Sequence, residues 1–170
     1  WIENTTPYEL RPIIKNAVLA WNIAFEEAGF IDAIEVKIQP DDADWSAGDI
    51  RYNVLRWTSS PNPPFGGYGP SFTNPRTGEI LGADIMLEWI YLTNRVRYSE
   101  IFENQEIHNK DFCLNSLIKQ ENRMFGKLAA EALDLKENDI SRLYEEDLYQ
   151  LILHEVGHTL GLNHNFAAST

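Results

Sequence analysis

The N-terminal part of the chain carries apolar residues three and four positions apart, the spacing of one helix face. Pro12 lacks a backbone donor and fits only the first turn of a helix, so the helix is expected to begin near Arg11. Gly29 ends the pattern, as glycine commonly does just after a helix. The pattern predicts a helix packed against a sheet through Ile13, Ile14, Ala17, Val18, Trp21, Ala24, Phe25 and Ala28.

Three later segments have the features of half-buried strands. Residues 34–38 alternate between apolar and polar side chains, and residues 50–57 form a second candidate strand. A Thr-Gly turn leads into the third, residues 79–87, whose apolar face consists of Leu81, Ala83, Ile85 and Leu87. Asp84 lies on the other face of this strand, where it is either a substrate contact or an ordinary strand carboxylate.

Two connecting segments leave alternatives open. The acidic cluster of Asp41, Asp42 and Asp44 is either a calcium site or a solvated turn, and the turn is favoured because acidic side chains prefer turns and water. The long Pro/Gly-rich loop at residues 59–75 is either the rim of a cleft or a covering loop, since loops of this length are commonly functional or mobile.

Residues 94–142 are predicted to be mostly helical. Cys113 lies at the start of an amphipathic stripe, where it is either a zinc-blocking thiol or, as we favour, a small buried hydrophobe. His108 lies in a polar run and receives no role. The stripe itself comprises Leu117, Ile118, Met124, Phe125, Leu128, Ala129 and Ala132.

A last helix, expected to begin between Ser141 and Glu145, carries the densest chemistry in the chain. Residues 154–164 read H-E-x-x-H-x-x-G-x-x-H. Residues four apart lie on one face of a helix, so His154 and His158 can direct their imidazoles to a common point. The opposite face is apolar and is expected to pack in the core through Tyr149, Ile152, Leu153, Val156 and Leu160.

The spacing of this motif suits a zinc site. Zinc accepts imidazole nitrogens at about 2.0–2.1 Å in a tetrahedral arrangement. Glu155 is turned by about 100° from His154, so it can reach a water molecule on the metal without being a ligand. Gly161 can end the helix in the left-handed conformation, which lets His164 return as a third ligand. Three protein ligands leave one position open, as in a catalytic rather than a structural site.

The full pattern is specific, because it arises by chance in roughly one chain of this length in 10⁵. It resembles the motif of the metzincin metallopeptidases. The longer strings HEVGHTLGLNHNFAAS, from His154 to Ser169, and PRTGEILGADI, from Pro75 to Ile85, are similar to large, uncharacterised bacterial zinc-dependent metallopeptidases of metzincin type. AWNIAFEEAGF at residues 20–30 and DIRYNVLRW at residues 49–57 resemble the same group.

The resemblance implies an α+β fold, in which a mixed twisted sheet is combined with a backing helix and a zinc-binding active-site helix. It also implies that a peptide substrate lies extended along a sheet-edge strand running from Gly82 to Leu87. Metzincins have a methionine-containing turn downstream of the third histidine, whereas Met86 and Met124 both precede the motif.

Residues 1–170 are therefore expected to form the upper subdomain with the active-site helix, without the C-terminal subdomain and its methionine turn. Residues 94–142 would be a helical insertion within that subdomain. Such a piece is expected to bind zinc weakly and to have little peptidase activity, and its uncovered apolar surface is one through which a homodimer could form.

Composition narrows the remaining possibilities. The net charge of −12 disfavours a nucleic-acid partner, which would require a basic surface. One cysteine excludes an internal disulfide, and no apolar run approaches the length of a membrane helix. From the resemblance we expect an exported protein, whether periplasmic, cell-surface or secreted, with its signal outside this sequence.

These features together predict a zinc endopeptidase with His154, His158 and His164 as ligands and Glu155 as the general base. One alternative is a non-catalytic binding module that keeps zinc as a structural element, although such a module has no need of a positioned base. The second alternative is a zinc hydrolase that acts on another amide or on an ester.

Overall fold

The computed structural model describes residues 1–60, 67–88 and 137–164. Cys113, His108 and the predicted stripe within residues 94–142 lie outside this described part, apart from residues 137–142, which belong to the last helix. The elements are α1 (Arg11–Leu19), α2 (Trp21–Glu27), β1 (Val54–Thr58), β2 (Gly67–Tyr68), β3 (Ser71–Thr73), β4 (Ile80–Glu88) and α6 (Glu137–Thr159).

The predicted N-terminal helix is present as α1 followed by α2. Pro12 occupies the first turn of α1, where its missing N–H leaves no helical bond unmade. The two helices meet at Ala20, which itself keeps helical dihedral angles, with φ −60° and ψ −25°. Gly29, at φ +90°, ends α2 in the left-handed region, as the sequence predicted.

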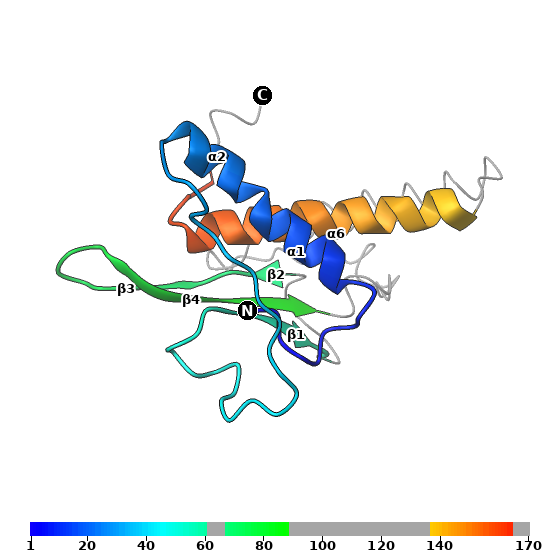
Figure 1. Cartoon of the computed structure of the whole chain (residues 1–170), viewed down its shortest axis with the longest axis horizontal. Helices are drawn as coiled ribbons and strands as arrows, with labels where there is room; N and C mark the ends of the chain where they lie inside the picture. The colour runs from blue at the N-terminus through cyan, green and yellow to red at the C-terminus, as the bar shows by residue number, and fades with distance from the viewer. Residues whose placement is uncertain (61–66, 89–136, 165–170) are drawn as a thin grey trace, which may run out of the picture.

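The sheet is mixed, with β4 at its centre (Figure 1). β1 runs parallel to β4, in a register from Val54↔Asp84 to Thr58↔Glu88. β2 and β3 both run antiparallel to β4 on its other side. Helices combined with a mixed open sheet confirm the predicted α+β class.

The structure corrects the predicted position of the sheet edge. The strand from Gly82 to Leu87 is not an edge, because β1 pairs with one side of β4 while β2 and β3 pair with the other. Gly67 pairs with Leu87, and Phe72 pairs with Gly82. The strands that border the sheet on this side are β2 and β3, and both lie within residues 59–75, which the sequence predicted to be a loop.

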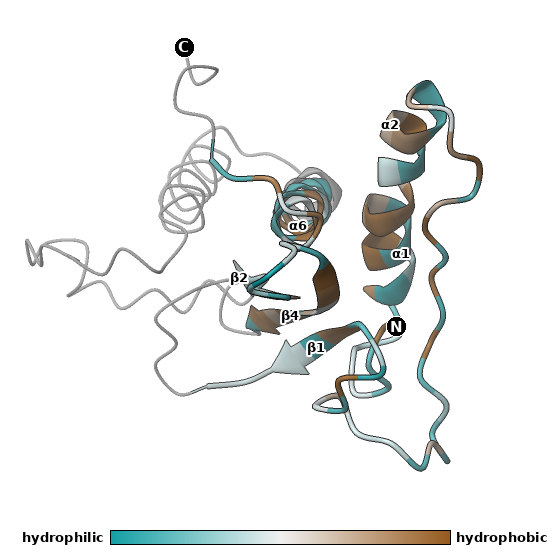
Figure 2. Cartoon of the chain, turned by 90° about the vertical axis from the view of Figure 1, so that its left-hand side faces the viewer, coloured by the Kyte–Doolittle hydropathy of each residue, from teal (hydrophilic) through white to brown (hydrophobic). Residues whose placement is uncertain are grey.

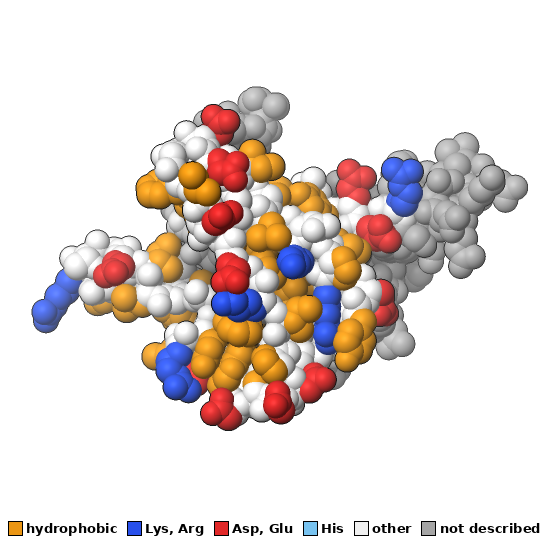
Figure 3. Space-filling model, viewed as in Figure 1, with side chains coloured by type: hydrophobic (Ala, Val, Ile, Leu, Met, Phe, Trp, Pro, Cys, Tyr) orange, Lys and Arg blue, Asp and Glu red, His pale blue; other side chains and the backbone are white. Residues whose placement is uncertain are grey.

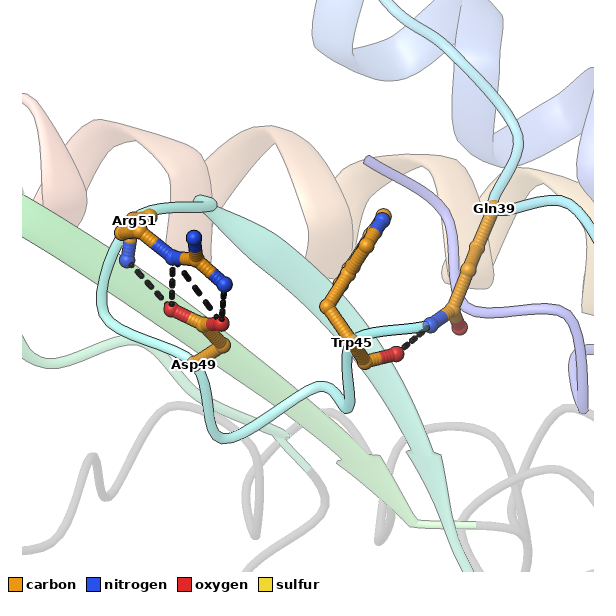
Figure 4. A network of polar contacts seen from close by, with 4 residues as sticks. All are labelled: Gln39, Trp45, Asp49 and Arg51. Carbon is orange, nitrogen blue, oxygen red and sulfur yellow. Dashed lines mark hydrogen bonds and ion pairs between the residues drawn. The ribbon is translucent and has the colours of Figure 1, made fainter. Parts of the chain in front are cut away.

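The first two predicted strands are also shorter than expected. The segment 34–38 forms only a single bridge, in which Ile2 pairs with Ile38 and, on its other side, with Leu55. Within the predicted strand 50–57, regular pairing begins at Val54 because residues 49–52 form a turn. Arg51 closes that turn by donating to both carboxylate oxygens of Asp49, which lowers the pKa of Asp49 to about 2 (Figure 4).

The same loop contains the acidic cluster for which calcium was one interpretation. Asp41, Asp42 and Asp44 are exposed, as in a solvated turn. Gln39 holds the loop from inside, since its side-chain amide donates to the carbonyl of Trp45 at 3.0 Å (Figure 4). This hydrogen bond ties the loop to Gln39, which is itself buried.

The core lies between the sheet and the helices α1 and α6, which cover the same face of the sheet (Figures 1 and 2). The apolar face predicted for α6 is confirmed in part, because Ile152 and Val156 are buried, and Tyr149 and Leu160 pack beside them. α6 begins at Glu137, earlier than predicted. The buried members of the core include Ile2, Ile14, Ala17, Leu55, Ile85, Leu87, Leu148, Leu151 and Ile152.

Charged side chains are dispersed on the face seen in Figure 3, where Lys and Arg lie among acidic and apolar residues instead of gathering in one patch. The β3–β4 hairpin projects from the body (Figure 1) and exposes Phe72 and Leu81. No helix within the described ranges is long and apolar enough to cross a membrane.

Candidate metal centre

Three histidines converge at the C-terminal end of α6. The Nε2 atom of His154 lies 3.1 Å from Nε2 of His158 and 3.2 Å from Nε2 of His164. Tetrahedral ligands at the usual zinc–nitrogen distance lie about 3.3–3.4 Å apart, close to both separations. In the part of the chain that the structure describes, this is the one group of three metal-ligating side chains whose ligand atoms come so close together.

The second ring nitrogen of His158, Nδ1, has a hydrogen-bond partner in the backbone. Its Nδ1 lies 2.9 Å from the carbonyl oxygen of Leu162, which can only accept, so Nδ1 carries the proton in this contact. The Nε2 atom then keeps its lone pair for a metal. Metal-binding histidines commonly have such a backbone partner, which fixes the tautomer and the orientation of the ring.

The end of α6 delivers the third histidine. Gly161 adopts φ +93°, a left-handed conformation. The N–H of Leu162 donates to the carbonyl of Gly157, and the N–H of Gly161 donates to the carbonyl of His158. This pair of bonds is a Schellman motif, which closes the helix and turns the chain back. The conformation predicted for Gly161 is therefore present, and His164 lies beside the other two rings.

The electrostatics of His164 suit a ligand. Partial burial of the ring, together with the neighbouring His158, lowers the pKa of His164 below its ordinary value. A lowered pKa keeps the imidazole neutral to lower pH, and only the neutral ring has a lone pair for a metal. The donor set, the distances and the tautomer all fit zinc.

Glu155 occupies a different environment from the histidines. It lies next to His154 in sequence but is only 1% exposed, because β2 lies against its side chain. Glu155 is not a member of the three-histidine group. The sequence predicted this offset but not the burial, since nothing in the local pattern indicates that residues 67–69 cross the helix at this point.

The other side of the same helical turn is held by Trp21 of α2. Its indole N–H donates to the carbonyl of Leu153 at 3.0 Å. A Cβ added to Gly157 would lie 3.0 Å from Cζ2 of Trp21, so the absence of a side chain at position 157 lets the indole approach the helix. The sequence placed Trp21 on a core-facing helix face but gave no signal for this contact with the motif.

Asp84 has the features of an ordinary strand carboxylate. Its Oδ1 accepts a hydrogen bond from the backbone N–H of Val54 at 3.3 Å. Burial raises the pKa of Asp84, and the Val54 amide and the charge of Arg56 partly offset that rise. Alternation along β4 places Asp84 on the face opposite Ile85 and Leu87, away from α6.

Comparison with known proteins agrees with this geometry. Residues 136–170, which include α6 from its first residue and the whole motif, match a protein-family model described as Met-zincin. No curated protein and no solved structure matches the chain. The segment that carries the three histidines is therefore similar to the Met-zincin family in sequence, and its histidines are placed to bind a metal.

Proposed function

We propose that the protein is a zinc-dependent endopeptidase in which His154, His158 and His164 hold the metal and Glu155 is the general base. The observation that carries the proposal is the convergence of three Nε2 atoms at the end of α6, with Glu155 next to His154 in the sequence and outside the ligand set. A zinc site that serves only structure requires a fourth protein ligand and no base. Three ligands with a base beside them favour hydrolysis.

Zinc, when bound, supplies a Lewis acid that polarises a carbonyl group and lowers the pKa of water. The carboxylate of Glu155 accepts a proton from the attacking water and then delivers it to the nitrogen of the departing amine. Because β2 covers Glu155, its carboxylate is shielded from bulk solvent, which strengthens its interaction with nearby charge. The Leu162 carbonyl keeps His158 in its ligand tautomer throughout.

For the substrate we propose an extended peptide along the outer side of β2 and β3. Among the described strands, β2 and β3 lie beside β4 on the side away from β1 and form the border of the sheet there. An extended peptide that adds to a sheet edge forms main-chain hydrogen bonds irrespective of its side chains. The position replaces the expected Gly82–Leu87 strand, whose two sides are both occupied within the sheet.

A mixed peptide library, incubated with the zinc-loaded protein, tests this function. We expect cleavage at internal peptide bonds, loss of cleavage after chelation and its return when zinc is added back. Hydrolysis of esters or non-peptide amides alone would favour the broader zinc-hydrolase alternative. Absence of any turnover by a protein that retains zinc would favour the non-catalytic binding module and contradict the proposal.

A further inference from the structure

The backbone of β2 and the residue just after it contact the active-site helix at two glycines, Gly67 of β2 and Gly69, which we call the glycine pair. Both members of the pair are buried, and an added Cβ at either one would meet atoms of α6. A Cβ added to Gly67 would lie 3.0 Å from Cγ and 3.1 Å from Oε1 of Glu155. A Cβ added to Gly69 would lie 2.6 Å from the backbone oxygen of Glu155.

The glycines are required here by space and not by backbone conformation. Among the described glycines, the left-handed region holds Gly29, Gly78 and Gly161, and neither member of the pair. A Cβ at position 69 would collide with the backbone oxygen of Glu155, whereas a Cβ at position 67 would crowd the side chains of Glu155 and Leu151 at 3.0–3.1 Å. The absence of side chains at Gly67 and Gly69 therefore allows the backbone of this segment to contact the helical turn that carries Glu155.

The strand cannot simply move away to admit a side chain. Gly67 and Tyr68 pair with Leu87 and Met86 of the central strand β4, which fixes the position of β2. On the opposite side of the same turn, Trp21 packs against Gly157. The helical turn that carries Glu155 is therefore packed between β2 and Trp21. Each of these contacts is possible because a glycine, with no side chain, lies at the point of closest approach.

We infer that Gly67 and Gly69 are positioning residues for the general base: they allow β2 to lie on α6 and so fix the carboxylate of Glu155 relative to the three histidines. The inference rests on the proposed function of Glu155. The nearest neighbours of an added Cβ at either glycine belong to Glu155 and Leu151, and none belongs to a histidine ring, so we expect the pair to act on the base more than on the metal ligands.

The first test compares Gly67→Ala and Gly69→Ala with Gly82→Ala as the matched control. An added Cβ at Gly82, also in this sheet, meets its nearest neighbours at 3.6–3.7 Å, which is ordinary contact. We expect each variant of the pair to lower kcat by about 10- to 100-fold, because a displacement near 1 Å can cost about that much. KM and zinc affinity should remain within about twofold of the parent protein, and Gly82→Ala should retain full turnover.

A second test needs no turnover and uses the metal-free protein. The neighbours of an alanine at position 67 are mainly side-chain atoms of Glu155, so Glu155→Ala should remove much of the loss in denaturation midpoint that Gly67→Ala causes. The neighbour at position 69 is the backbone oxygen of residue 155, which Glu155→Ala leaves in place. Gly69→Ala should therefore lower the denaturation midpoint by the same amount in the parent protein and in the Glu155→Ala variant.

The two tests separate the possible failures. Full kcat in both glycine variants, or a fall in zinc affinity that matches the fall in kcat, would overturn the positioning role. If the parent protein hydrolyses no peptide, the proposed function fails, and the denaturation cycle still decides whether Gly67 contacts the Glu155 side chain.

Equal rescue of both variants by Glu155→Ala would contradict the contacts described for the pair. If Gly69→Ala does not fold, Gly67→Ala carries the test, since its neighbours are side-chain atoms that can shift.

Discussion

Glu155→Gln is expected to lower peptide turnover by about 10²- to 10⁴-fold while zinc binding is retained. Glutamine has nearly the shape of glutamate, so it fits the same buried position beneath β2, where residue 155 is 1% exposed. It cannot accept a proton from water at neutral pH, and the general base is therefore lost. The change is read from kcat/KM on a peptide substrate, with zinc content measured on the same samples.

Glu146→Gln is the matched control, because Glu146 is an exposed glutamate on the same helix. Its turnover should equal that of the parent protein. A parallel loss of zinc and activity in Glu155→Gln would show that residue 155 is a metal ligand, which is incompatible with the proposed mechanism. Unchanged turnover in that variant would exclude Glu155 as the base.

Gly161→Val is expected to weaken zinc binding by about 10- to 100-fold, the range found when a second-shell partner of a metal ligand is lost. A β-branched residue is badly strained at φ +93°, so the closing turn of α6 should rearrange. That turn holds both the Leu162 carbonyl against His158 and the backbone that leads to His164. Zinc affinity is measured by competition with a chelator of known affinity.

Gly29→Val provides the control for strain alone. Gly29 ends α2 at φ +90° and has no neighbour within 4 Å of an added Cβ, so valine there costs stability at a distance from the histidines. Its zinc affinity should not change. Gly161→Asn should retain more affinity than Gly161→Val, because asparagine tolerates the left-handed conformation. Equal affinity in Gly161→Val and the parent protein would show that this turn does not place the third ligand.

The zinc motif and its helix could be predicted from the sequence because their information is local. The four-residue spacing of His154 and His158 follows from helix geometry. The role of Gly161 follows from a conformation that favours glycine, and the structure has that conformation at this position. The alternation along residues 79–87 likewise identified β4, since Ile85 and Leu87 share one buried face.

The sheet edge could not be predicted in the same way, because strand order depends on contacts between distant segments. Glycine, proline and polar residues at 67–75 are typical of a loop, yet backbone pairing with β4 makes β2 and β3 strands. The alternation in residues 34–38 predicted a strand, but only Ile38 forms a bridge there. The side-chain amide of Asn22 in α2 instead bonds both the N–H and the carbonyl of Ile34, which satisfies backbone groups that strand pairing would otherwise use.

The burial of Glu155 was missed for a related reason. A helix pattern indicates which side of the helix a residue faces, but not which distant strand lies over it. The glycine pair gives no sequence signal by itself, since glycines at 67 and 69 fit a loop equally well. Only the approach of β2 to α6 reveals why residues without side chains are needed there.

X-ray absorption at the zinc edge of the metal-loaded protein tests the central claim, an open three-histidine site, most directly. The arrangement of His154, His158 and His164 predicts three imidazole nitrogens at about 2.0–2.1 Å and one oxygen from solvent. His164→Ala should reduce the nitrogen count by one and leave the other two in place. Four protein ligands around the metal, or the same nitrogen count in His164→Ala, would contradict the open catalytic site.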